Sequence, residues 1–147
     1  MQNGTDQERE PRVGSLDHVA VLVRDTDRAL DHFSRHLGLR VTHQERLEQP
    51  PVLLTWLDAG ATALQLVQPL DDRSDLATVL AERGEGLHHL CFAVPDVQEA
   101  TRALAPTAGP SPVVQVRGQL ASFVPGPAAH GVLLECTQSD PSTPSVS

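Results

Sequence analysis

The sequence predicts an α+β fold built from two tandem copies of a βαβββ module. The first observation is an internal repeat, because residues 16–30 resemble residues 87–101, at an offset of 71. The second is that the module ends also correspond, with residues 62–67 matching residues 132–137 at an offset of 70. The third is that each copy opens with an apolar run typical of a strand, followed by a segment that reads as a helix. Two nearly equal offsets indicate a duplication rather than a chance resemblance.

The first copy begins with an expected strand at residues 16–23, which are rich in Val and Leu. A helix should follow from Asp25 or Thr26, because either residue suits a helix N-cap. Apolar residues then recur at a spacing of three or four, and Gly38 is expected to end the helix. Three further strands are expected at residues 39–44, 52–57 and 63–67.

The second copy repeats this order. We expect a strand at residues 86–94, a helix at residues 96–104, and strands near residues 113–116, 121–124 and 132–137. The linker at residues 69–85 contains a short amphipathic helix around residues 74–82. The sequence therefore predicts one domain at residues 14–137, with module one at 14–68, the linker at 69–85 and module two at 86–137. Residues 1–13 and 138–147 are too polar to bury apolar surface and are expected to be disordered tails.

Composition excludes several classes of function. The formal net charge of -8 argues against non-specific binding to nucleic acid, which requires clustered cationic side chains. No apolar run approaches the length of a membrane span, and the N-terminus lacks the apolar stretch of a secretory signal. The 2 cysteines form no disulfide framework. A cytoplasmic location is the default expectation.

The repeat also pairs four polar side chains on otherwise apolar strands. His18 corresponds to His89, and Gln65 corresponds to Glu135. Buried polar groups need partners, and one divalent ion would satisfy all four side chains at once. This mixed nitrogen and oxygen set suits Co, Mn, Ni, Zn or Fe. The alternative for each histidine taken alone is a packed residue without a metal. Strand alternation places His88 on the face opposite His89, as a structural or supporting group.

Four motifs carry a resemblance to a known family: LDHVAVLV from residue 16, QLVQPL from residue 65, GEGLHHLCFAV from residue 84 and GVLLEC from residue 131. They resemble the methylmalonyl-CoA epimerases, a branch of the vicinal-oxygen-chelate superfamily, which also contains glyoxalase I, extradiol dioxygenases and bleomycin-resistance proteins. The resemblance implies a cupped eight-stranded sheet around one divalent metal ion, and commonly a homodimer. It assigns the metal ligands to His18, Gln65, His89 and Glu135.

The family chemistry that this resemblance implies is stabilisation of a metal-bound enolate of a carbonyl or acyl-thioester substrate. Epimerisation moves protons on opposite faces of one carbon, so two bases are needed. The resemblance assigns one base to Glu135. Aligned on Glu48, the second base falls at Leu53, which cannot transfer a proton. Glu45 and Glu48 are the nearby replacements, and Glu48 is the second catalytic candidate.

The sequence therefore favours a metal-dependent isomerase or lyase, similar to the epimerases but recruited to another substrate, for example in secondary metabolism. One alternative is a non-catalytic small-molecule binding or resistance protein, against which the intact ligand set counts. Another is a metal-dependent dioxygenase, whose two-histidine, one-carboxylate site would not need Gln65.

The composition of the two ends generates a first prediction. Removing residues 1–13 and 138–147 should leave the melting temperature unchanged, because these segments offer little apolar surface to the core. Differential scanning fluorimetry of the full and trimmed chains measures this. A drop of several degrees would move the domain boundaries outward.

Overall fold

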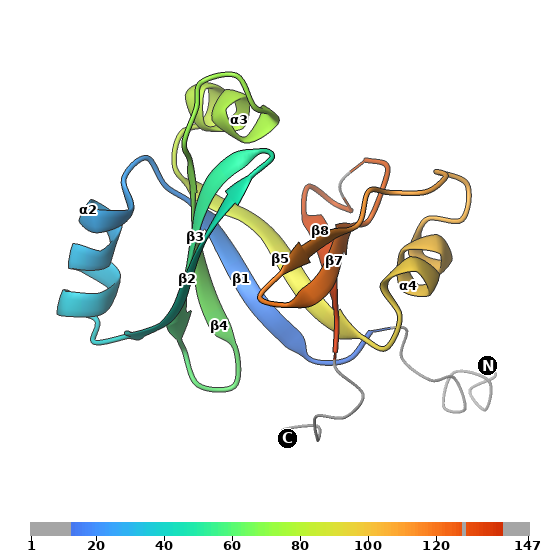
Figure 1. The fold of residues 1–147 in the computed structure, drawn as a ribbon, viewed down its shortest axis with the longest axis horizontal. Helices are drawn as coiled ribbons and strands as arrows, with labels where there is room; N and C mark the ends of the chain where they lie inside the picture. Colours follow the sequence, from blue (N-terminus) through green and yellow to red (C-terminus); the bar gives the residue numbers. More distant parts are fainter. Residues whose placement is uncertain (1–12, 128, 140–147) are drawn as a thin grey trace.

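The computed structural model describes residues 13–127 and 129–139. These residues form one eight-stranded mixed sheet with the strand order β2-β3-β4-β1-β5-β8-β7-β6. The sheet curves into a nearly closed cup, in which the wing that carries β2, β3 and β4 faces the wing that carries β7 and β8 (Figure 1). The predicted α+β fold of two βαβββ modules is confirmed.

The first module has its elements in the expected order: β1 (Leu16–Leu22), α2 (Thr26–Leu30), η1 (Asp31–His36), β2 (Arg40–Glu48), β3 (Pro51–Asp58) and β4 (Ala63–Pro69). The linker forms α3 (Asp75–Arg83). The second module contains β5 (Gly86–Val94), α4 (Val97–Leu104), β6 (Val114–Val116), β7 (Gln119–Phe123) and β8 (Leu133–Gln138). Among these described helices, none is long and apolar enough to cross a membrane.

The two modules meet at the middle of the sheet. β1 and β5 pair antiparallel with each other, and each pairs parallel with the last strand of its own module, β4 or β8. The short strand β6 and the long strand β2 form the two edges. Side chains on the concave face of the four central strands therefore point into one shared space.

Equivalent residues fix the helix of each module. The N-caps of α2 and α4 are Asp25 and Asp96, whose carboxylates accept hydrogen bonds from backbone N–H groups in the first turn. Gln68 at the end of β4 accepts a further bond from the N–H of Thr26, at 2.8 Å. Gln138 at the end of β8 does the same for Val97, at 3.1 Å. The duplication thus extends to the way each helix is tied to its sheet.

Two expectations about element boundaries need correction. The first helix is α-helical only to Leu30 and continues as the π-helix η1, where the N–H of Leu37 bonds to the carbonyl of His32 at 3.0 Å. Strand β2 extends to Glu48, beyond the expected end at residue 44, because it pairs with β3 along its length.

The ordered chain also reaches slightly beyond the expected domain. Val13 packs against the apolar cluster around Val97, and β8 includes Gln138. The N–H of Ser139 donates to the carbonyl of Val94 at 2.9 Å. A trimmed chain should therefore keep these three residues, while the rest of both predicted tails lies outside the described residues.

The helix caps generate a second prediction. Asp96→Ala should lower the free energy of unfolding by about 1 kcal/mol, because the substitution leaves N–H groups in the first turn of α4 without their acceptor. Urea denaturation followed by circular dichroism measures the change. Asp72→Ala, at an exposed position before α3, is the matched control and should be nearly neutral. An equal loss in both variants would contradict the capping role.

Candidate metal centre

Strand register brings the four predicted ligands to the concave face. Ala20 on β1 pairs with Gln65 on β4 and with His89 on β5. His18 lies two residues before Ala20, so it shares that face. Its partner on β5 is Cys91, which pairs in turn with Glu135 on β8. All four ligands are buried, with exposed fractions of 4% for His18, 3% for Gln65, 7% for His89 and 8% for Glu135.

Three of these side chains converge at one point. The Nε2 atoms of His18 and His89 lie 3.4 Å apart. Oε1 of Glu135 lies 3.3 Å from Nε2 of His18 and 3.1 Å from Nε2 of His89. Ligand atoms this close, from two imidazoles and a carboxylate, form a group that can hold a metal ion.

The Nδ1 atoms of both rings already have hydrogen-bond partners. Nδ1 of His18 lies 2.8 Å from Oδ2 of Asp17. A carboxylate only accepts, so His18 donates there through Nδ1, and Nε2 is the nitrogen of this ring that faces the centre. Nδ1 of His89 lies 2.7 Å from Nδ1 of His88, where one ring must donate to the other. With His89 as the donor, the Nε2 atoms of both rings face the Glu135 carboxylate, where each can donate to it when protonated or bind a cation when not.

Two β-bulges place these supporting side chains. The register of β1 and β5 shifts between Leu16 and His18, which leaves Asp17 as the extra residue on β1. It shifts again after Ala20, which leaves His88 as the extra residue on β5. Asp17 and His88 are equivalent positions of the two modules, and each contacts the ligand ring that follows it. Bulges re-aim side chains in this way and are common beside active sites.

The prediction that His88 lies on the face opposite His89 is therefore wrong. His88 lines the same cavity as the ligands, because the bulge interrupts strand alternation at this residue. Burial, and then the neighbouring His89, lower the pKa of His88 to about 4. His88 is therefore neutral at physiological pH, so its Nδ1 can accept a hydrogen bond from Nδ1 of His89.

The charges at the centre favour an ionised carboxylate. Burial alone would raise the pKa of Glu135, but hydrogen bonds and charge from His18 and His89 outweigh it and hold the pKa far below its usual range. Burial likewise opposes ionisation of Asp17, yet its bonds to His18 and Arg117 lower its pKa. The pKa of His18 is raised, because its bonds to Asp17 and Glu135 outweigh the effect of burial.

Gln65 provides an independent test of whether these residues fit a metal. Its Oε1 is buried and has no hydrogen-bond partner among the described residues. A buried amide oxygen without a partner costs free energy, because it loses its bonds to water. Gln65 lines the same cavity as the two histidines and Glu135. A divalent ion held by His18, His89 and Glu135, with the amide oxygen of Gln65 as a further ligand, would satisfy this group.

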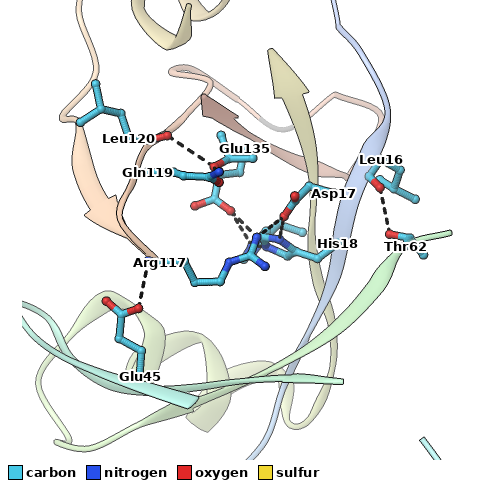
Figure 2. A network of polar contacts seen from close by, with 11 residues as sticks. Leu16, Asp17, His18, Glu45, Thr62, Arg117, Gln119, Leu120 and Glu135 are labelled. Carbon is cyan, nitrogen blue, oxygen red and sulfur yellow. Dashed lines mark hydrogen bonds and ion pairs between the residues drawn. The ribbon is translucent and has the colours of Figure 1, made fainter. Parts of the chain in front are cut away.

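The centre lies in a cavity of about 510 Å³ between the two wings. Apolar side chains from β3 and α3 line one side, including Leu54, Trp56 and Val79. Phe123 and Leu133 of the second module line the other. Figure 2 shows Glu135, His18 and Asp17 grouped beside the β6–β7 hairpin, from which Arg117 extends toward them. The cavity can admit a mainly apolar ligand with its polar head at the ligand cluster.

The structure does not bring Glu48 to this centre. Its side chain is 79% exposed and lies 3.5 Å from Arg46 on the edge strand β2. The neighbouring residue Leu47 lines the cavity instead, so alternation directs Glu48 away from it.

Leu53, the position at which the second base was expected, also points away. It pairs with Gln68, which bonds to α2 on the convex side of the sheet. The residues of β3 that line the cavity are Val52, Leu54 and Trp56. The residues that β3 directs into the cavity are therefore all without a carboxylate, so none of them can act as the second base.

The chain belongs to the glyoxalase/bleomycin resistance protein/dioxygenase superfamily, whose family model matches residues 17–117. It is 30% identical over 124 residues to the uncharacterized protein YqjC of Bacillus subtilis (strain 168), covering 82% of this chain and 89% of that protein.

Solved structures place the chain more narrowly within this superfamily. Methylmalonyl-CoA epimerase from Mycobacterium tuberculosis aligns with a TM-score of 0.79 and 27% identity, over 92% of this chain and 96% of that chain. A variant of the Streptomyces coelicolor methylmalonyl-CoA epimerase, in complex with 2-nitronate-propionyl-CoA, aligns with a TM-score of 0.75 and 28% identity. That alignment covers 86% of this chain and 98% of that chain. The protein is thus a member of the superfamily that is similar to methylmalonyl-CoA epimerases.

The ligand geometry generates a third prediction. The purified protein should bind about one divalent ion per chain, and His18→Ala or His89→Ala should abolish binding without unfolding the chain. Affinity should fall as pH is lowered, because protons compete for Nε2 of His18, whose pKa is raised. Metal analysis and titration with Co²⁺ test this. His32→Ala, at an exposed position of η1, is the control. Wild-type protein that takes up no Co, Mn, Ni, Zn or Fe would refute the assignment.

Proposed function

We propose that the protein is a metal-dependent isomerase or lyase, related to the epimerases, that stabilises an enolate of a carbonyl or acyl-thioester substrate. The observation that carries this proposal is the buried cluster of His18, His89 and Glu135 at one end of an apolar cavity. When bound there, a divalent ion supplies Lewis acidity to the oxygens of a chelating substrate. The remaining chemistry falls to side chains of the chain itself.

Glu135 is the proton acceptor that we assign. Its contacts to both imidazoles run through Oε1, which leaves Oε2 for a substrate proton. Its low pKa makes it a weak base toward water, so it needs a substrate carbon whose acidity is raised by adjacent carbonyl groups. A 1,3-dicarbonyl compound or a malonyl-type thioester meets this requirement.

Epimerisation also requires proton transfer on the opposite face of the substrate. Among the described residues, Asp75 is the other carboxylate that lines the cavity, and it lies exposed in the first turn of α3. Val52, Leu54 and Val79 occupy the wall between α3 and β3. This arrangement favours reactions that need one base, such as double-bond isomerisation or elimination. We therefore propose that methylmalonyl-CoA is epimerised poorly.

The substrate class and assembly state are part of the same proposal. A related epimerase was solved with an acyl-CoA ligand, which supports an acyl thioester as the substrate of this chain. The family resemblance further implies a homodimer, and we propose this state together with a cytoplasmic location. Sedimentation velocity of the purified protein tests the homodimer.

Two glutamates provide a fourth prediction with its own control. The metal-loaded protein should exchange the C2 proton of methylmalonyl-CoA in deuterated water, while converting one epimer to the other slowly. Glu135→Gln should lower exchange by about 10²–10⁴-fold, the usual contribution of a positioned base. Glu48→Gln should leave exchange unchanged, because that side chain points away from the cavity. Proton nuclear magnetic resonance follows both reactions.

The results of these assays identify which residue, if any, acts as the second base. Rapid epimerisation by the wild type that is lost in Glu48→Gln would restore Glu48 as the second base. Rapid epimerisation that is lost in Asp75→Asn would assign that role to the cavity carboxylate on α3. Metal-loaded protein that exchanges no proton of any acyl thioester or 1,3-dicarbonyl compound tested would sink the proposed function.

A further inference from the structure

We propose that Arg117 is a positioning residue for the metal centre, which it serves by holding Asp17 against His18 from the β6–β7 hairpin. The inference rests on the proposed metal site, but it concerns a residue outside the ligand set. It assigns to the β6–β7 hairpin a role in metal affinity as well as in closing the cup.

The hairpin turn presents Arg117 in an unusual conformation. The turn consists of Arg117 and Gly118, since Val116 pairs with Gln119 across it. Both residues have positive φ, 53° for Arg117 and 72° for Gly118. Two-residue hairpins of this type favour Asn, Asp or Gly at both positions, because a side chain in the left-handed region is strained. An arginine there requires contacts that outweigh the strain.

Those contacts reach three strands of the first module, and Figure 2 shows the two that Arg117 makes with Glu45 and Asp17. The backbone N–H of Arg117 donates to Oε1 of Glu45 on β2, at 2.9 Å. The guanidinium lies over the ring of Trp56 on β3, 4.8 Å from its centroid. The same guanidinium donates to Oδ2 of Asp17 on β1, at 2.8 Å. The hairpin beside edge strand β6 is thereby joined to the other edge strand, β2, across the mouth of the cup.

The bond to Asp17 links Arg117 to the metal centre. One carboxylate oxygen, Oδ2, accepts both from the guanidinium and from Nδ1 of His18. The carboxylate is therefore held from two sides, with its lone pairs directed at the imidazole. Partners of this kind fix the tautomer and orientation of a metal-binding histidine, and their loss typically lowers metal affinity about 10–100-fold.

Among the described residues, the second module contains no equivalent of the contacts that run from Arg117 through Asp17 to His18. Its predicted ligand His89 contacts the neutral His88. The ring of His88 packs edge-on against the rings of His89 and Phe123. The support from Arg117 thus acts on one ligand of the pair. Loss of Arg117 should loosen His18 while leaving His89 and Glu135 in place.

The experiment measures Co²⁺ affinity of the full chain by competition with a chelator, together with the visible absorption of the Co²⁺ complex. Arg117→Met removes the charge and keeps the aliphatic stem, and it should weaken binding about 10–100-fold and alter the absorption bands. Arg117→Lys keeps a donor for Asp17 and should recover part of the affinity. Arg46→Met, at an exposed site on β2, is the matched control.

A double-mutant cycle tests the route through Asp17. In an Asp17→Asn background, Arg117→Met should have almost no further effect on Co²⁺ affinity. An equal loss in both backgrounds would overturn the proposal, as would Arg117→Met that is folded by circular dichroism and binds Co²⁺ like the wild type. If Arg117→Met does not fold, the Arg117→Lys comparison in both backgrounds decides the question. Wild-type protein that binds no Co²⁺ would instead refute the metal site itself.

Discussion

The structure depends on one electrostatic constraint, which is the convergence of buried polar side chains at the centre of the sheet. Nδ1 of His18 is bonded to Asp17, so Nε2 of the same ring faces the Glu135 carboxylate at 3.3 Å. Gln65 adds an amide oxygen that no donor reaches in the part of the chain that the structure describes. A buried amide oxygen without a partner costs free energy, and a buried carboxylate must be paired, so a cation held here would stabilise the group. The cupped sheet is the geometry that brings these side chains together from β1, β4, β5 and β8.

Much of this centre could be predicted from the sequence, because the duplication carries strand alternation with it. The offset between His18 and His89 predicts equivalent places on two central strands, and the register confirms that both face the cup. The same reasoning is wrong for His88, since a bulge adds one residue and reverses the face on which a side chain lies. A local slip of this kind depends on pairing with β1, which no pattern within β5 reveals.

The position of the second base was also not predictable from the sequence, because it too depends on how strands pair. The sequence assigned it to Leu53 or Glu48 from an alignment, but pairing with β4 places Val52, Leu54 and Trp56 in the cavity. Arg117 was not predicted at all, because its partners lie far away in the chain. The sequence contained one signal that could have indicated its role. Arg117 precedes Gly118 in a tight hairpin, where left-handed φ is expected and a residue other than glycine is strained.

The two modules have the same scaffold, and what distinguishes the site is the way in which they differ. Gln65 and Glu135 occupy equivalent positions, but one is a neutral amide and the other a carboxylate. Glu135 is the one carboxylate of the four predicted ligands, so a divalent cation held by them would be only partly neutralised. Such a centre favours ligands that acquire negative charge on oxygen. Under the proposed function, a second carboxylate in place of Gln65 would remove that excess positive charge, and the neutral amide would preserve it for an enolate oxygen.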